Sequence, residues 1–461
     1  MNILKNKKIF IAPYTPMSNA LKRFLSEKFE IDFLGFIDKN KSGKGIYKID
    51  NINANYDYIV ILSPNHFQDI YKDYIKIVDK RKLIVIEIEN QKYNIKHDIN
   101  LEQDRIKTLS LQHPRKQGIV FISKGFVDTN NKYLFLSCYR SKLDVTLITD
   151  NKDHLNKLKA HDLPVIEMNT KEADTKISLA KYIVFDQANY TNFFIHPAQT
   201  TIQQWHGVGL KKMSKLTNIV YDYFISTSKW TNKTNFKNVF LAKKYLDYGY
   251  PRNEFLLRET KEEDLLLCDK DLYELSLRHK IILYMPTIRE YLFSKKDTLE
   301  NILNISLKNL NEELRKLDYI MIVKLHPYVI EFYKDFIINC TYSNIFFHSA
   351  QGDVYPVLKN TDILVTDYSS VAYDFLLLNK KIIFFDYDRD VYEKNMGGFL
   401  FDYDKYSPGI KTKTQEEMIN AIYAPDVYSK NRSQIKKLFF NEKTIHKSTD
   451  LIKNLFKKEY V

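Results

Sequence analysis

Strand-like and helix-like segments alternate along almost the whole chain, and this alternation limits the possible folds more than any other feature. Short runs rich in Ile, Val and Phe, such as YDYIVILSP at 56–64 and LIVIEIE at 83–89, stand between longer stretches with helical spacing of apolar residues. Such an order is typical of α/β domains with parallel sheets. The 461 residues suffice for several domains of this kind.

The pattern predicts a small Rossmann-like domain at the start of the chain. Its first turn, at 12–16, contains no glycine where a dinucleotide needs close approach of the backbone, and a polar stretch at 104–117 is interpreted as a linker. The predicted parts are 1–105 (the small α/β domain, of open role), 113–249 and 250–430 (two further α/β halves), and 431–461 (a basic helical tail).

The charge balance favours an anionic partner. There are 70 Lys and Arg residues against 57 Asp and Glu, a net charge of +13, which suits nucleic acid, an anionic membrane surface or a phosphate-rich substrate. The three cysteines are far apart in the sequence and show neither metal-ligand spacing nor a disulfide framework, which fits a reducing compartment. No stretch reaches the ~18–20 apolar residues that span a bilayer, so we expect a cytoplasmic protein.

The segment DILVTDYSSVAYD at 362–374 carries the sharpest local signal. A buried strand ends near Thr366, and a helix is expected to begin at Ser369 and Ser370, whose free N–H groups hold phosphate oxygens well. Ligands of open α/β sheets lie beyond the carboxyl ends of strands, and Asp374, one turn on, is within reach of a ribose. An ordinary capped helix is the alternative.

Two more predicted strands end in groups suited to phosphate. MPTIRE places Arg289 after one strand, and VKLHP places Lys324 and His326 after the next. Taken alone, one such residue is more simply interpreted as a solvated arginine. Adjacent strands, however, would bring all of these groups to one crevice. In the preceding half, QQWHGVGLKKM holds His206, which can take a proton near neutral pH, beside glycines that permit close approach of a substrate. A structural histidine beside a packed Trp205 is the alternative there.

Together these segments resemble the CDP-glycerol:poly(glycerophosphate) glycerophosphotransferase family, which includes teichoic-acid polymerases and primases and their capsule-synthesis relatives. The resemblance begins near residue 121 and leaves the first 110 residues outside. The matching segments are FISKGFVDTNNKYL (121–134), QQWHGVGLKK (203–212), GYPRNEFLL (249–257), LYMPTIRE (283–290), VKLHP (323–327), DVYPVLKNTDILVTDYSSVAYDFLLLNKKIIFFDYD (353–388), GGFLFDY (397–403) and the Pro-Gly pair at 408–409.

The resemblance implies a GT-B fold, in which two Rossmann-like halves face a cleft, here preceded by the small α/β domain. It implies that an acceptor hydroxyl attacks the β-phosphorus of CDP-glycerol and displaces CMP. The residues carried over by motif are His206 as general base, His326 as a second catalytic residue on the diphosphate, and Arg289, Thr366, Ser369, Ser370, Asp374 and Lys211 as substrate-binding residues.

No metal and no cofactor is expected, since cationic groups and a helix start can stabilise the transferring phosphoryl group. The D-x-D sequences at 386–388 and 402–404 are interpreted as structural or loop acids rather than as metal ligands. Val208-Gly209 stands where many relatives have Thr-Pro, and PRNE replaces the commoner PRND, which leaves the identity of the acceptor open.

The expected partners are CDP-glycerol and a polyanionic or lipid-linked glycan acceptor at the inner face of the cell membrane, where the basic tail either lies on the surface or packs across the two halves. A close alternative keeps the fold and uses CDP-ribitol, another CDP-linked phosphoryl donor or a nucleotide sugar. A nucleic-acid-binding protein is suggested by the isoelectric point alone. No motif supports that reading, so no specific nucleic acid is expected.

Overall fold

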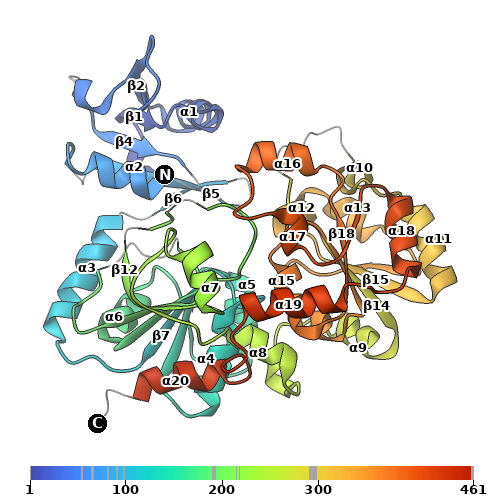
Figure 1. Cartoon of the computed structure of the whole chain (residues 1–461). Helices are drawn as coiled ribbons and strands as arrows, with labels where there is room; N and C mark the ends of the chain where they lie inside the picture. The colour runs from blue at the N-terminus through green and yellow to red at the C-terminus, as the bar shows by residue number, and fades with distance from the viewer. Residues whose placement is uncertain are drawn as a thin grey trace. The chain divides into compact units, whose positions relative to one another are not determined.

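The computed structural model describes residues 2–52, 55–63, 67–79, 82–89, 92–96, 99–188, 194–213, 215–217, 219–289 and 298–457 (Figure 1). The chain forms two compact units, one of Met1–Pro114 with Asn192–His196 and one of Arg115–Thr191 with Pro197–Val461. None of the described helices is long and apolar enough to cross a membrane.

The first unit is a Rossmann-like sheet in the order β3-β2-β1-β4-β5-β6, parallel except for the β5–β6 pair. Its apolar strand residues are buried on both faces, as in a parallel sheet covered by helices. The short β3 and the polar β6 were not predicted, because neither has an apolar run. The elements are β1 (Lys8–Ala12), α1 (Pro16–Phe29), β2 (Asp32–Ile37), β3 (Ile46–Tyr47), β4 (Tyr58–Ile61), α2 (Phe67–Tyr74), β5 (Leu83–Glu89), β6 (Lys92–Lys96) and α3 (Ile99–Gln112).

The predicted linker at 104–117 is wrong over most of its length. Helix α3 continues to Gln112, and Ile106 and Ser110, four residues apart on one face, are both fully buried. The stretch looked like a linker because most of its side chains are polar and it contains Pro114. Only the residues after the helix form an extended connection.

The second unit begins with a seven-stranded parallel sheet in the order β13-β12-β11-β10-β7-β8-β9. Capping side chains start several of its helices, for example Thr129 before α4 and Ser228 before α7. Its elements are β7 (Ile119–Ser123), α4 (Asn130–Arg140), β8 (Val145–Thr149), α5 (Lys152–Lys159), β9 (Val165–Glu167), α6 (Lys171–Leu179), β10 (Tyr182–Phe185), β11 (Thr200–Gln203), β12 (Val220–Ile225), α7 (Lys229–Thr231), the π-helical turn η4 (Asn232–Phe236) and β13 (Leu241–Leu246).

The rest of this unit is built on a six-stranded parallel sheet in the order β16-β15-β14-β17-β18-β19. Its elements are α8 (Pro251–Leu257), α9 (Lys270–Arg278), β14 (Lys280–Met285), α10 (Leu299–Leu303), α11 (Leu307–Leu317), β15 (Tyr319–Val323), α12 (Pro327–Phe332), α13 (Lys334–Ile338), β16 (Ile345–Phe347), α14 (Tyr355–Asn360), β17 (Ile363–Thr366), α15 (Val371–Phe375), β18 (Lys381–Phe385), α16 (Arg389–Met396), α17 (Tyr403–Tyr406), β19 (Ile410–Thr412) and α18 (Gln415–Tyr423).

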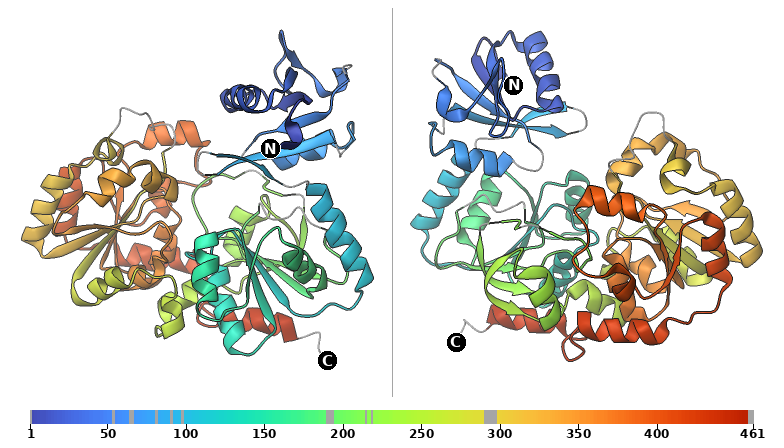
Figure 2. Two further views of the ribbon diagram at one scale, coloured as in Figure 1. Left: turned by 180° about the vertical axis from the view of Figure 1, so that it is seen from behind. Right: turned by 45° about the horizontal axis from the view of Figure 1, so that its top comes forward.

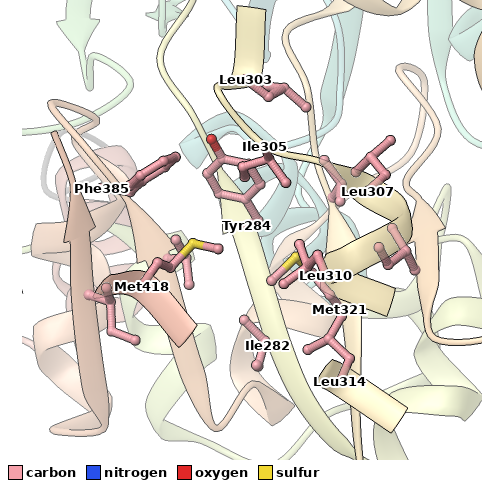
Figure 3. Packing of buried hydrophobic residues seen from close by; sticks show 14 of the residues in the cluster. Ile282, Tyr284, Leu303, Ile305, Leu307, Leu310, Leu314, Met321, Phe385 and Met418 are labelled. Carbon is pink, nitrogen blue, oxygen red and sulfur yellow. The ribbon is translucent and has the colours of Figure 1, made fainter. Parts of the chain in front are cut away.

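A dense apolar core fixes this second sheet. Figure 3 shows Ile282 and Tyr284 of β14 packed among side chains of α11, with Leu310 and Leu314 on the helix and Met321 on β15. All five are almost completely buried. Because this core fixes the positions of the strands, it also fixes where the loops that follow them begin.

The C-terminal tail crosses both halves of the second unit, as α19 (Ser429–Phe439) and α20 (Ser448–Lys457) show in Figures 1 and 2. Phe439 of α19 stacks on Tyr373 with ring centroids 4.3 Å apart. Phe456 of α20 packs edge-on against Tyr182 of β10. The apolar faces of both helices are therefore used for packing between the two halves, which leaves lysines on the outer side.

Candidate active site

A pocket of about 340 Å³ lies between the two halves of the second unit. The first half contributes only the loop after β11, and the second contributes the loops after β14, β15 and β17. The pocket is lined by Trp205, His206, Gly207, Gly209, Lys211, Met213, Met285, Pro286, Thr287, Ile288, Lys324, Leu325, His326, Pro327, Tyr368, Ser369 and Ser370.

The position of this pocket follows from strand order. In the second sheet the order reverses between β14 and β17, and a crevice opens at the carboxyl ends of the two strands on either side of such a reversal. The loops at 285–288 and 368–370 follow these two strands directly. The expectation that the strands ending near 285, 323 and 366 are adjacent is confirmed, since β15, β14 and β17 are neighbours.

Ser369 and Ser370 face the pocket and are half-buried. The helix starts one residue later than expected, at Val371, and Ser370 is its N-cap residue but makes no side-chain cap hydrogen bond. The Ser369 hydroxyl lies 3.5 Å from the Val371 amide, at the limit of a hydrogen bond. Because α15 has only five residues, its dipole is short. The two hydroxyls, rather than the helix, are the main polar groups that this turn offers to a ligand.

Arg289 differs from the expectation, since it does not line the pocket. Its guanidinium is 2% exposed and donates to Asp388 through Nε at 2.6 Å and to the carbonyl of Thr287 through Nη1 at 2.8 Å. Nη2 lies 2.9 Å from Asp367. These acids raise the pKa of Arg289 despite its burial. The side chain therefore braces the loops after β14 and β17 against each other from behind the pocket.

The loop after β15 contains an exposed histidine, His326, and a buried lysine, Lys324. His326 is exposed at the pocket, where it caps α12 by accepting the Tyr328 amide on Nδ1 at 3.2 Å. Lys324 is 7% exposed, and its ammonium donates to the carbonyls of Ser349 and Gly352 at 2.9 and 2.8 Å. Contrary to the expectation, Lys324 is thus mostly satisfied by the protein.

His206 is the histidine that the first half brings to the pocket. Its Nδ1 lies 3.2 Å from the carbonyl of Asp186, which can only accept, so Nδ1 carries the proton and Nε2 has the lone pair. Burial is the main cause that lowers the pKa of His206 to about 4, and the charge of Arg252 adds to the shift. The imidazole is therefore neutral at physiological pH. Trp205, with its ring centroid 3.8 Å away and φ of 56°, holds it in a strained turn.

The glycines of this loop line the pocket and also lie close to the second half. At Gly207, with φ of 150°, a Cβ atom would lie 2.9 Å from the Ser370 hydroxyl and 3.0 Å from Nη2 of Arg252. The close neighbour is thus the other half of the protein rather than a substrate. Lys211 follows in the same loop, lines the pocket and forms a β-bridge to Phe399, with its ammonium 5.6 Å from the ring centroid of Tyr392.

Asp374 is buried behind the pocket and is not among the described residues that line it. Arg252 donates to Oδ2 of Asp374 at 2.8 Å, Asn253 to Oδ1 at 2.8 Å, and the Tyr355 hydroxyl to Oδ2 at 2.5 Å. Both carboxylate oxygens of Asp374 are thus bound by protein groups, and the expected contact with a ribose stays a prediction. Thr366 is also fully buried and donates to the carbonyl of Met285, which suits a supporting role.

Sequence reasoning missed Arg252 and Asp186. Arg252 stands in the quoted GYPRNEFLL segment, and its guanidinium joins α8 to α15 and also donates to the carbonyl of Asp128. Asp186 follows β10, accepts the Ser123 hydroxyl at 2.6 Å, and has its pKa raised to about 7 by burial. For Asp186 a carboxyl directly after a strand was the available signal, whereas Arg252 lies inside α8 and offered none of this kind. Neither position reveals partners that are distant in sequence.

The D-x-D acids occupy structural positions. Asp388 binds Arg289, Asp402 caps α17 and Asp404 binds Arg389. Within the described ranges, no group of three or more His, Cys, Asp or Glu side chains is arranged to hold a metal ion.

Two facing Rossmann-like halves with a pocket at the strand-order reversal of the second half are the arrangement of the GT-B fold. The family described as CDP-glycerol:poly(glycerophosphate) glycerophosphotransferase matches residues 105–457. The chain belongs to this family.

Known relatives agree with this assignment. The chain is 32% identical over 261 residues to a teichoic acid poly(glycerol phosphate) polymerase of Bacillus spizizenii, covering 51% of this chain and 64% of the relative. It is 34% identical over 175 residues to a teichoic acid poly(ribitol-phosphate) polymerase of the same organism, covering 38% of this chain and 27% of the relative. It thus spans less than two thirds of either relative's length.

A solved structure of the wall teichoic acid polymerase TagF supports the fold. It superposes with a TM-score of 0.63 at 24% identity, over 79% of this chain and 95% of the other. The expected GT-B fold is thereby confirmed.

Proposed function

We propose that this protein transfers glycerol phosphate from CDP-glycerol to a hydroxyl of a lipid-linked or oligosaccharide acceptor, releasing CMP, in the synthesis of a teichoic-acid-like or capsular polymer. One observation carries the proposal. A neutral histidine from one half and two serine hydroxyls from the other, His206 with Ser369 and Ser370, face a single pocket at the strand-order reversal. Family membership and the printed names of the relatives support the same chemistry.

His206 is the proposed general base. Its Nδ1–H is held by the Asp186 carbonyl, so Nε2 can accept the proton of the attacking hydroxyl. The acceptor oxygen forms a bond to the β-phosphorus as the bond from that phosphorus to the bridging oxygen breaks. CMP departs with the bonding electrons as a stable anion, so the leaving group requires no general acid.

Ser369, Ser370, Lys211 and His326 are the proposed contacts of the diphosphate, because all four line the pocket. In-line phosphoryl transfer depends chiefly on positioning and on stabilising charge. Arg289 does not contact the diphosphate in this proposal. It holds its own loop, after β14, against Asp367 after β17 and Asp388 after β18.

A donor assay tests the proposal. Purified protein is incubated with CDP-glycerol, CDP-ribitol, UDP-sugars and GDP-sugars, and the released nucleotide is identified. We expect CMP from CDP-glycerol, with glycerol phosphate incorporated into the acceptor. Release of UDP or GDP with sugar transfer would instead establish a glycosyltransferase and overturn the proposal. CDP-ribitol is the second candidate donor, favoured by the likeness to a poly(ribitol-phosphate) polymerase.

We further propose that the protein works at the inner face of the cell membrane, where a lipid-linked acceptor would be met. The net charge of +13 supports attraction to an anionic surface. Flotation with anionic vesicles tests this, and failure to float at low salt would contradict it.

A further inference from the structure

Positive charge is concentrated in one part of the second unit. Between Asp186 and Asp247 the sequence holds eight lysines and a single acid, Asp222, which gives this stretch a net charge of +7 out of +13 for the whole chain. The acid is itself engaged, since its carboxylate accepts from Thr201 at 2.8 Å and from Lys243 at 2.7 Å. Apart from the half-buried Lys211, the remaining lysines of this stretch are exposed.

Three of these lysines form a row. Lys229, Lys233 and Lys237 are exposed and follow one another at intervals of four, in α7, in the π-helical turn η4 and directly after η4. Residues four apart in an α-helix lie close to one face. Across this π-helical turn the three lysines are likewise all exposed. The opposite side of the same segment is buried, with Asn235 and Phe236 fixed inside. The row thus points outward.

The row is tied to the loop that carries His206. Nδ2 of Asn235 donates to the carbonyl of Gly209 at 2.9 Å, and the Leu216 amide donates to the carbonyl of Val239 at 3.2 Å. Two further exposed lysines, at 212 and 215, lie in the loop between these attachments, directly after the pocket-lining Lys211. We name Lys212, Lys215, Lys229, Lys233 and Lys237 the lysine track.

We propose that the lysine track binds the anionic chain of the acceptor, a phosphodiester polymer whose terminal hydroxyl enters the pocket at His206. This inference rests on the proposed function and adds to it a binding surface for the acceptor chain. A polymer with one phosphodiester for every three carbons carries charges at a spacing of the same order as the lysines. Successive ammonium groups can therefore meet successive phosphates.

The packing of the segment favours a polymer over a bilayer. A helix that lies on a membrane turns its apolar face outward, whereas here Phe236 is fully buried. Trp230 packs against Phe401 and Phe439, with ring centroids 5.4 and 4.9 Å apart. Leu216 and Val220 are exposed in the same stretch, however, so the test includes vesicles as a competing ligand.

The test compares two triple variants of the full chain. Lys229→Gln/Lys233→Gln/Lys237→Gln removes the row. Lys308→Gln/Lys316→Gln/Lys334→Gln removes equal charge from exposed lysines of α11 and α13. Binding of a short poly(glycerol phosphate) oligomer, and of phosphatidylglycerol vesicles, is measured for both variants and the wild type over a range of salt concentrations. CDP binding is measured alongside as a check on the pocket.

We expect the row variant to bind the oligomer at least about tenfold more weakly, and its slope of log K against log salt to fall by about 2, at roughly 0.7 per lost phosphate contact. The control variant and CDP binding should match the wild type. Equal losses in the two variants would overturn the inference, as would a wild type that binds vesicles but not the oligomer. Failure of the donor assay would instead overturn the proposed function, because oligomer binding is measured without any donor.

Discussion

The two halves of the second unit share a strand order but use it differently. In both, the order reverses at the first strand, between β7 and β10 in one sheet and between β14 and β17 in the other. In the first half this reversal is filled, because the Ser123 hydroxyl and the Asp186 carboxyl are fully buried and bonded to each other. In the second half the reversal is open, and Ser369 and Ser370 line the pocket there.

In the proposed function, this difference gives the two halves different tasks: the second half binds the nucleotide and the first half supports the proposed base. The open reversal can hold a nucleotide diphosphate, whereas the filled one serves as a rigid support for His206 through the carbonyl of Asp186. The general rule for ligands of doubly wound sheets thus applies to one half only. The four predictions below test this division, starting with the largest effect.

Removal of the proposed base, His206, should abolish phosphoryl transfer and leave CDP binding unchanged. We expect His206→Ala to lower kcat by roughly 10²- to 10⁴-fold, the usual contribution of a general base, with CDP affinity unchanged. The rate of CMP release and calorimetry with CDP measure the two effects, and His161→Ala, at an exposed histidine, is the control. Activity retained in His206→Ala would contradict the assignment of the base to the first half.

Arg289→Met should destabilise the donor half. Loss of the guanidinium leaves Asp367 and Asp388 buried without their partner, at a cost of about 3–5 kcal/mol of unfolding free energy. Lys211→Met should change unfolding by less than about 0.5 kcal/mol and weaken CDP binding instead. Urea unfolding and calorimetry compare the two variants. An Arg289→Met protein of normal stability that fails to bind CDP would show that this arginine contacts the donor directly.

Two neighbouring glycines give a matched pair for the contact between the halves. Gly207→Ala places a methyl group 2.9 Å from the Ser370 hydroxyl at φ of 150°, so we expect a loss of about 1–3 kcal/mol in stability together with weaker CDP binding. In Gly209→Ala the nearest atom, Cβ of Ser370, is 3.4 Å away, and little should change. Equal behaviour of the two variants in thermal unfolding would argue against close contact at Gly207.

The enclosure of His206 should appear in the pH dependence of stability. Its pKa is about 4 in the folded protein against an ordinary value of 6.5, so between these values the unfolded chain binds more protons. Relative to His206→Gln, the wild type should therefore lose about 1–3 kcal/mol as pH falls from 6.5 to 4. Urea unfolding of both proteins at pH 7 and 4.5 measures this. Parallel curves would mean that the imidazole is solvated.

The sequence predicted the ends of the strands beside the pocket well, because neighbouring residues alone indicate where such a strand ends. A buried apolar run followed at once by polar residues locates the ends of β14, β15 and β17, and parallel pairing then brings them together. The sequence did not predict that Arg289 is buried and bound to acids, because its partner Asp388 is 99 residues away. A strand-end arginine looks the same whether it binds a ligand or a buried acid.

The contact between the halves escaped prediction for the same reason. Gly207 indicated a close approach, but the approaching group, Ser370, lies in the other half. Arg252 likewise joins Asp128 to Asp374, residues that no local pattern connects. The lysine track, by contrast, can be read from sequence once charge is counted in windows rather than over the whole chain.

The central claim is that a cytidine diphosphate lies between the halves with its phosphates on Ser369 and Ser370. A crystal structure of the His206→Ala protein soaked with CDP-glycerol tests it most directly. The account predicts diphosphate oxygens within hydrogen-bond distance of both serine hydroxyls and the glycerol end directed toward position 206. A nucleotide bound in the first unit, or on the filled reversal of the first half beside Asp186, would contradict it.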